Sequence, residues 1–131
     1  MREHENKPMK PPAVPLVLVR AKAAYQLWHK YLVNLKRLDR YTIGFKIDET
    51  FLSLLEFIFR ACFAYDKFEK LSLLSQAIGK SDLLKFSLQI GWEQTIIDQK
   101  NYGVLILNLD EIGRQLGAWK KSVQEKTLLP K

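Results

Sequence analysis

The sequence predicts an all-α protein, an antiparallel up-down four-helix bundle. Apolar residues recur at spacings of three and four along most of the chain, which is the helical period. No Asn-Gly or Asp-Gly hairpin turn separates the apolar runs, so no sheet is expected. Four amphipathic segments joined by short links are typical of this architecture.

Length and composition set the domain organisation. The chain has 131 residues, of which 47% are hydrophobic and 27% charged, so one folded domain is expected. Four of the first fifteen residues are proline, which disfavours helix, and residues 1–15 are predicted to be a flexible tail. The bundle is expected over residues 16–126, followed by a C-terminal tail over 127–131.

The first helix is expected near 16–37 and the second near 43–66, with a connection over 38–44. The apolar stripe of the first helix comprises Leu18, Ala21, Tyr25, Trp28, Leu32 and Leu35. The second helix has two apolar seams: one holds Ile47, Phe51, Leu54, Ile58 and Tyr65, the other Phe45, Leu52, Leu55, Phe59 and Phe63. Two seams give this helix more apolar surface than a helix with one solvent-exposed face needs to bury. We expect this helix to be central or to be buried against a second copy.

The third stretch, residues 68–98, is either one long helix or two short ones. Gly79 costs helix stability, and Ser81 or Asp82 is suited to capping a second helix. The last helix has the most regular stripe: Tyr102, Leu105, Leu109, Ile112, Leu116, Trp119 and Val123. Asn101 is its predicted N-cap. Gly113 and Gly117, one turn apart, suggest that a neighbouring backbone approaches closely.

The sequence contains few residues in the patterns that catalysis or metal binding requires. The two histidines, His4 and His29, have no partners at zinc or di-iron spacing. Helical HEPN ribonucleases place an arginine five residues before a histidine, and here Ala24 stands in that position. Neighbouring carboxylates such as Asp48 and Glu49, or Asp110 and Glu111, point in different directions and suit solvated faces. We predict no enzyme activity, no metal and no cofactor.

The cellular setting follows from the cysteine count and the hydropathy. The single cysteine, Cys62, cannot form an internal disulfide, and its apolar neighbours suit a buried residue in a reducing compartment. Residues 1–10 contain no secretory apolar region, and no apolar run reaches the ~18 residues that cross a bilayer. A soluble, cytoplasmic protein without a membrane partner is expected.

The positive charge is concentrated in one part of the chain. The net charge is +7, and residues 20–46 carry seven basic side chains against Asp39 alone. Such asymmetry favours a polyanionic partner such as RNA, although a merely solvated surface remains an alternative. The residues predicted to contact RNA are Arg20, Lys22, Lys30, Lys36, Arg37, Arg40 and Lys46, with Lys120 and Lys121 as secondary contributors. Tyr25, Trp28, Tyr31 and Tyr41 are interleaved with them, and for Tyr25 and Trp28 core packing is favoured over base stacking.

Two short strings carry a family resemblance. Residues 111–119 read Glu-Ile-Gly-Arg-Gln-Leu-Gly-Ala-Trp, and residues 40–44 read Arg-Tyr-Thr-Ile-Gly. With the helix order, they resemble the four-helix-bundle family that includes the accessory variability determinant (Avd) of diversity-generating retroelements. The same family contains proteins encoded in intervening sequences of 23S ribosomal RNA genes.

The resemblance implies a non-enzymatic accessory factor that assembles as a homopentamer and binds reverse transcriptase and template RNA. Arg40 and Arg114 are the basic members of the matched strings, and Arg114 and Lys85 are added to the predicted RNA- and partner-binding residues. Relatives can carry a Leu-Arg-x-x-x-Arg run in the third helix; here Lys85 keeps the first basic position and Gln89 replaces the second. The ribosomal-RNA-insert type, a structural or interaction protein, remains the alternative.

Overall fold

Four long helices make up the fold of residues 15–128, which are the residues that the computed structural model describes. They are α1 (Leu16–Leu32), α3 (Phe45–Phe63), α4 (Lys67–Glu93) and α5 (Gln99–Leu128). A short helix, α2 (Arg37–Asp39), and a π-helical turn, η1 (Arg40–Gly44), precede α3. The described residues contain no strand. The predicted all-helical fold with four helices is confirmed.

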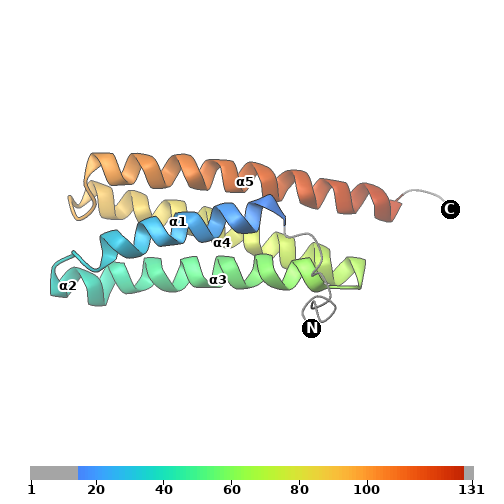
Figure 1. Ribbon diagram of the computed structural model, residues 1–131, viewed down its shortest axis with the longest axis horizontal. Helices are drawn as coiled ribbons and strands as arrows, with labels where there is room; N and C mark the ends of the chain where they lie inside the picture. The colour runs from blue at the N-terminus through green and yellow to red at the C-terminus, as the bar shows by residue number, and fades with distance from the viewer. Residues whose placement is uncertain (1–14, 129–131) are drawn as a thin grey trace, which may run out of the picture.

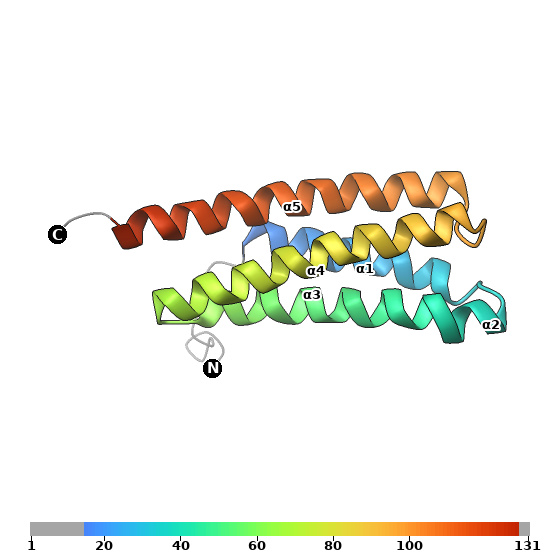
Figure 2. The same cartoon turned by 180° about the vertical axis from the view of Figure 1, so that it is seen from behind.

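The long helices lie side by side along the long axis of the molecule (Figures 1 and 2). The links from α1 to α3 and from α4 to α5 lie at one end, on the left of Figure 1, and the link from α3 to α4 lies at the other. Helix α3 packs on α4, α4 on α5, and α1 on both α3 and α5. None of the helices in this range combines the length and the apolarity that a membrane span requires.

The core draws on all four long helices. Trp28 of α1, Phe51 of α3, Leu84 of α4 and Ile112 of α5 are all fully buried. The predicted stripes of the first and last helices are buried or packed against the core, although Leu35 lies beyond the end of α1. The first seam of α3 is also buried, except for Tyr65, which was wrongly placed: α3 ends at Phe63, and Tyr65 is 98% exposed.

The first connection differs from the prediction. Helix α1 ends at Leu32, five residues early, and helical backbone resumes at Arg37, so residues 38–44 are not a connection. Gly44 explains the difference: a Cβ at this position would lie 2.8 Å from the Asp39 carbonyl oxygen and 3.0 Å from a Leu32 methyl group. The missing side chain lets η1 pack against the end of α1, so this glycine supports a helical turn.

Helix α4 is continuous, which decides between the two readings of residues 68–98. Asp66 caps it, since its carboxylate accepts the Glu69 N–H at 2.8 Å. Gly79 lies inside the helix, and a Cβ there would meet nothing within 4 Å. Burial of Leu74, Ala77 and Leu84 on both sides of Gly79 offsets the roughly 1 kcal/mol that a helical glycine costs. The helix then ends at Glu93, and residues 94–98 form a link.

Two predictions about α5 are wrong. Its N-cap is Asp98, whose carboxylate accepts the N–H of Asn101 at 2.8 Å, whereas Asn101 itself lies inside the helix. At Gly113 and at Gly117, a Cβ would meet no atom within 4 Å, so no other described segment approaches either glycine closely. Most of the predicted tails, residues 1–14 and 129–131, lie outside the described residues. The predicted C-terminal boundary at residue 126 is two residues early, because residues 127 and 128 belong to α5.

Candidate nucleic-acid interface

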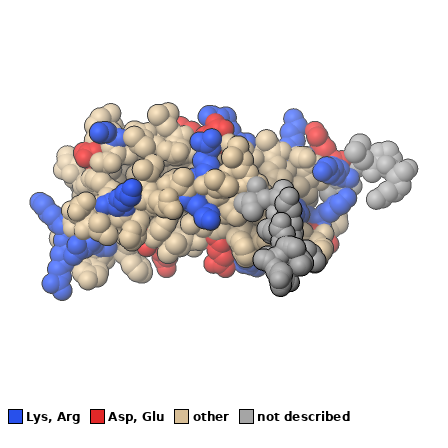
Figure 3. Space-filling view, viewed as in Figure 1, with Lys and Arg blue, Asp and Glu red and all other residues tan. Residues whose placement is uncertain are grey.

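Lys and Arg side chains gather at the end of the molecule that carries α2 (Figure 3). We call Lys36, Arg37, Arg40 and Lys46 the basic end. Lys36 precedes α2, Arg37 begins it, Arg40 opens η1 and Lys46 lies in the first turn of α3. Lys36, Arg37 and Lys46 are exposed and Arg40 is half-buried. The link from α1 to α3 and the first turn of α3 therefore place at one end of the molecule four cations from an eleven-residue stretch of the sequence.

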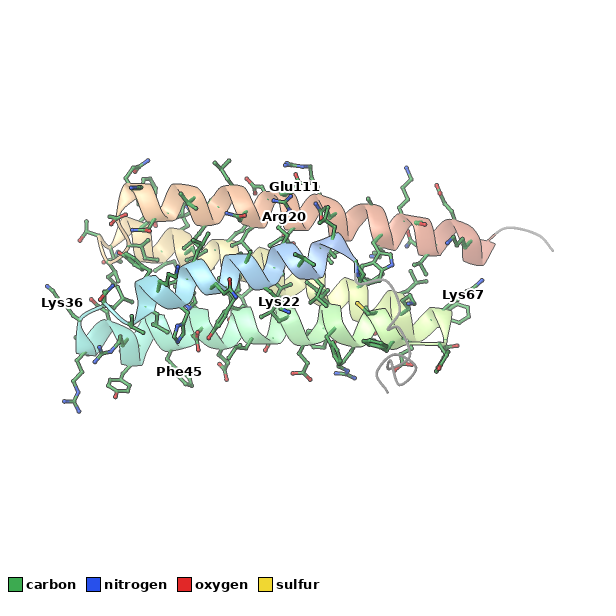
Figure 4. The ribbon with its side chains drawn as sticks, viewed as in Figure 1. Arg20, Lys22, Lys36, Phe45, Lys67 and Glu111 are labelled. Carbon is green, nitrogen blue, oxygen red and sulfur yellow. The ribbon has the colours of Figure 1, made fainter. Side chains whose placement is uncertain are left out.

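The remaining basic residues of α1 lie along the helix, away from this end. Lys22 and Lys30 are exposed, and Figure 4 shows Lys22 near the middle of the bundle. Arg20 is half-buried near Glu111 of α5, and its Nε is buried with no hydrogen-bond partner. Hydrogen bonds from Arg114 and Gln115, and the charges of Arg114 and Arg20, hold the pKa of Glu111 below its usual value. Arg20 therefore lies beside α5 and away from the basic end.

Four other predicted contacts are not part of the basic end. Lys85 of α4 forms ion pairs with Asp110 of α5 at 3.4 Å and with Asp82 at 3.9 Å. Arg114 donates to Glu111 within α5. Lys120 and Lys121 belong to the C-terminal third of α5, which lies toward the opposite end of the molecule (Figure 1).

Of the four interleaved aromatic residues, only Tyr41 is freely exposed, at 69%. The Arg37 guanidinium carbon lies 5.8 Å from the centroid of its ring. Trp28 is fully buried and Tyr25 half-buried, which agrees with the predicted core packing. Tyr31 is half-buried as well, and burial raises the pKa of its hydroxyl. Of these four rings, Tyr41 is therefore the one that is open to solvent.

Asp48 has a role that the sequence interpretation missed. Its Oδ1 accepts hydrogen bonds from the Tyr25 hydroxyl at 2.8 Å and from the Trp28 indole N–H at 3.2 Å, so it joins α3 to α1. Burial, followed by the hydrogen bond and the charge of Asp48, raises the pKa of Tyr25 to about 12. No local sequence signal distinguishes this carboxylate from the exposed Glu49, because its partners lie twenty or more residues away.

A hollow of about 530 Å³ opens where the two links meet at the basic end. One wall comes from Tyr31, Asn34, Leu35, Lys36 and Asp39, and the other from Gln94, Thr95 and Ile96. The Tyr31 hydroxyl donates to the Ile96 carbonyl at 2.9 Å and accepts the Asp98 N–H at 3.1 Å. One sequence feature coincides with this hollow, because Asp39 is the single acid among residues 20–46.

The other side chains that could bind a metal ion or act as nucleophiles are dispersed over the structure. Over residues 15–128 no three His, Cys, Asp or Glu side chains are grouped so that they could hold a metal ion. His29 is exposed, and its ring lies 5.9 Å from that of Tyr25. Cys62 is half-buried beside a mainly apolar hollow that Trp119 and Pro15 also line, and burial raises the pKa of its thiol. A raised pKa makes this thiol a poor nucleophile.

Comparison with known proteins gives a structural likeness only. No protein-family model and no curated protein matches the sequence. The fold is similar to the crystal structure of a protein of unknown function from the S23 ribosomal protein family of Bacteroides thetaiotaomicron. The two chains are 14% identical, and the match covers 78% of this chain and 98% of that chain with a TM-score of 0.60. At this identity the likeness shows a shared helical fold.

Proposed function

We propose that the chain is a non-enzymatic, cytoplasmic adaptor that binds RNA through its basic end. The observation that carries this proposal is the gathering of Lys36, Arg37, Arg40 and Lys46 where α1 links to α3. Each cation that meets a phosphate releases condensed counterions, which favours binding to any RNA. The exposed Tyr41 adds a ring on which an unpaired base can stack.

Within that class, we propose an accessory factor of a diversity-generating retroelement that also binds its reverse transcriptase and supports mutagenic cDNA synthesis. The support is the resemblance carried by residues 40–44 and 111–119. In the structure, Gly44 of the first string makes room for η1, and Leu116 and Trp119 of the second lie in or against the core. The strings therefore support a shared bundle, and the exposed Lys22 and Lys30 extend the surface available to a polymerase.

A bundle of the 23S ribosomal-RNA-insert type is the second candidate, favoured by the likeness to the S23-family structure. The two candidates differ in genomic setting. An adjacent reverse transcriptase gene and template repeat support the retroelement factor, whereas a position inside a ribosomal RNA operon supports the alternative. Co-purification with a neighbouring reverse transcriptase tests the first candidate directly.

The assembly proposed for either candidate is a closed homo-oligomeric ring of antiparallel up-down bundles, pentameric for the retroelement factor. Its support is an uncovered apolar face of α3, which we call the outer seam: Phe45, Leu52, Phe59 and Phe63 are between 47% and 60% exposed. A closed ring would cover such a face on every copy and repeat the basic end around its axis.

The test of RNA binding replaces Lys36, Arg37 and Arg40 with glutamine. Affinity for a single-stranded RNA should fall, and the slope of log affinity against log salt should decrease by roughly one unit per lost phosphate contact. Folding should change little, because surface substitutions usually stay within about 0.5 kcal/mol. Fluorescence anisotropy over a salt series measures both quantities.

The matched control removes the same charge from the opposite end, with Arg60, Lys67 and Lys126 replaced by glutamine. These three side chains are exposed, and Figure 4 shows Lys67 far from Lys36. This control should keep the wild-type salt slope. Full RNA affinity in the first triple variant, with the fold intact, would show that the basic end is not the RNA-binding surface.

A further inference from the structure

The hollow at the basic end has the size of a small-ligand site. Its volume of about 530 Å³ falls inside the range of roughly 300–1,000 Å³ that is usual for such sites. Leu35 and Ile96 supply apolar surface for the face of a flat ring. Asn34, Gln94 and Asp39 supply polar groups at its edge, and Lys36 brings a cation to the same rim.

The walls of the hollow are held by hydrogen bonds within the protein. Tyr31 joins them, because its hydroxyl bonds both the Ile96 carbonyl and the Asp98 N–H. The turn opposite is also held: the Thr95 N–H donates to the Trp92 carbonyl at 3.0 Å and the Ile96 N–H to the Gly91 carbonyl at 2.8 Å. Thr95 keeps a φ of 58°, which is unusual for a β-branched residue. A ligand therefore meets a wall that is already ordered, which lowers the cost of binding.

Asp39 determines which ligand fits. It is the only acid in the basic stretch 20–46, and over residues 15–128 its carboxylate forms no hydrogen bond or ion pair. A site for phosphate alone gains nothing from a carboxylate, since like charges repel. A carboxylate instead suits a ligand with N–H donors. Among the four RNA bases, only guanine presents two adjacent donors, the ring N1–H and the exocyclic amine, on its Watson–Crick edge.

We propose that the hollow binds one unpaired guanine of an RNA strand. The Asp39 carboxylate accepts the N1–H and the exocyclic amine, an amide N–H of Gln94 or Asn34 donates to the O6 atom, and Leu35 and Ile96 contact the ring. Lys36 and Arg37 neutralise the flanking phosphates. This inference rests on the proposed RNA binding and adds to it one position at which sequence is read, within an interaction that is otherwise electrostatic.

The test uses a short uridine strand with one central guanosine, and the same strand with adenosine or inosine in its place. The guanosine strand should bind the wild-type protein about 10-fold more tightly than the adenosine strand, on the order of a bidentate base contact. Inosine lacks the exocyclic amine and should fall between them. Asp39→Asn should abolish the preference while leaving the salt slope unchanged. The control Glu49→Gln removes an exposed acid from α3 and should retain the preference.

The outcomes separate this inference from the proposed function. Equal binding of all three strands, with a steep salt dependence, would overturn the guanine site and leave RNA binding in place. A preference that survives in a folded Asp39→Asn protein would also overturn it. Failure of every strand to bind at low salt would overturn the proposed function together with the guanine site.

Discussion

Asp48 shows how one side chain can join two helices. A single carboxylate oxygen accepts from both Tyr25 and Trp28, so the indole N–H of a fully buried tryptophan has a partner. The sequence predicts that Trp28 is buried, since the helical period places it on the apolar stripe. It does not predict the partner, because hydrogen bonding between α1 and α3 depends on how the two helices are aligned.

Removing this acceptor should destabilise the protein. Asp48→Ala leaves the Trp28 N–H and the Tyr25 hydroxyl without their partner and should lower the free energy of unfolding by about 1–3 kcal/mol. Asp48→Asn keeps an acceptor oxygen and should cost less. Urea denaturation measures both, with Glu49→Gln as a control expected within about 0.5 kcal/mol of the wild type. Wild-type stability in Asp48→Ala would contradict the role assigned to this carboxylate.

The raised pKa of Tyr25 predicts an alkaline loss of stability. The pKa is about 12 in the folded protein against the ordinary value of 10.0. Folding therefore favours the neutral hydroxyl; its contribution to stability is complete below pH 10 and is lost as the pH rises toward 12. Between these pH values, stability should fall more steeply in the wild type than in Tyr25→Phe. Parallel stability curves for the two proteins would be inconsistent with this prediction.

At the scale of elements, the sequence predicts the helices better than their ends. Apolar period places α1, α3 and α5, whereas for residues 68–98 it leaves open the choice between the single helix α4 and two short helices. The ends depend on contacts between elements. The junction of α1 with η1 requires that position 44 carry no side chain. The start of α5 is set by Asp98, which accepts the N–H of Asn101.

The Gly44 junction can be tested by adding a methyl group. Gly44→Ala should destabilise the protein by about 1–3 kcal/mol, because the new Cβ would lie 2.8 Å from the Asp39 carbonyl oxygen, which is backbone and cannot move aside. Gly79→Ala is the matched control, since it adds the same methyl group where nothing lies within 4 Å. It should stabilise the protein by about 0.4–1 kcal/mol. The two substitutions should shift the melting temperature in opposite directions in thermal unfolding. A higher melting temperature for Gly44→Ala would refute the close packing.

At the scale of the whole molecule, the site was only partly predictable. The order of helices indicates that Lys36, Arg37, Arg40 and Lys46 share one end, and the structure places them around one link. The hollow beside them was not predicted, because it forms only where residues 31–39 meet residues 94–96. Contacts between segments so far apart in the sequence leave no local pattern.

The outer seam of α3 predicts self-association. Light scattering at micromolar concentration should give a mass several times the 15.3 kDa of one chain. Replacing Leu52 and Phe59 by lysine should yield a folded monomer, because charges buried in an apolar contact are costly. Leu107→Lys, at an exposed apolar position of α5, should leave the assembly intact. A wild-type mass of one chain would rule out the assembly.

The placement of the first and last described residues has a practical consequence. Helix α1 begins, and α5 finishes, away from the end that carries α2 (Figure 1). A protein fused at Pro15 or at Leu128 is therefore attached away from the basic end and does not obstruct it. Tethering the chain to a solid support through either position would present Lys36 and its neighbours to the solution in a uniform orientation.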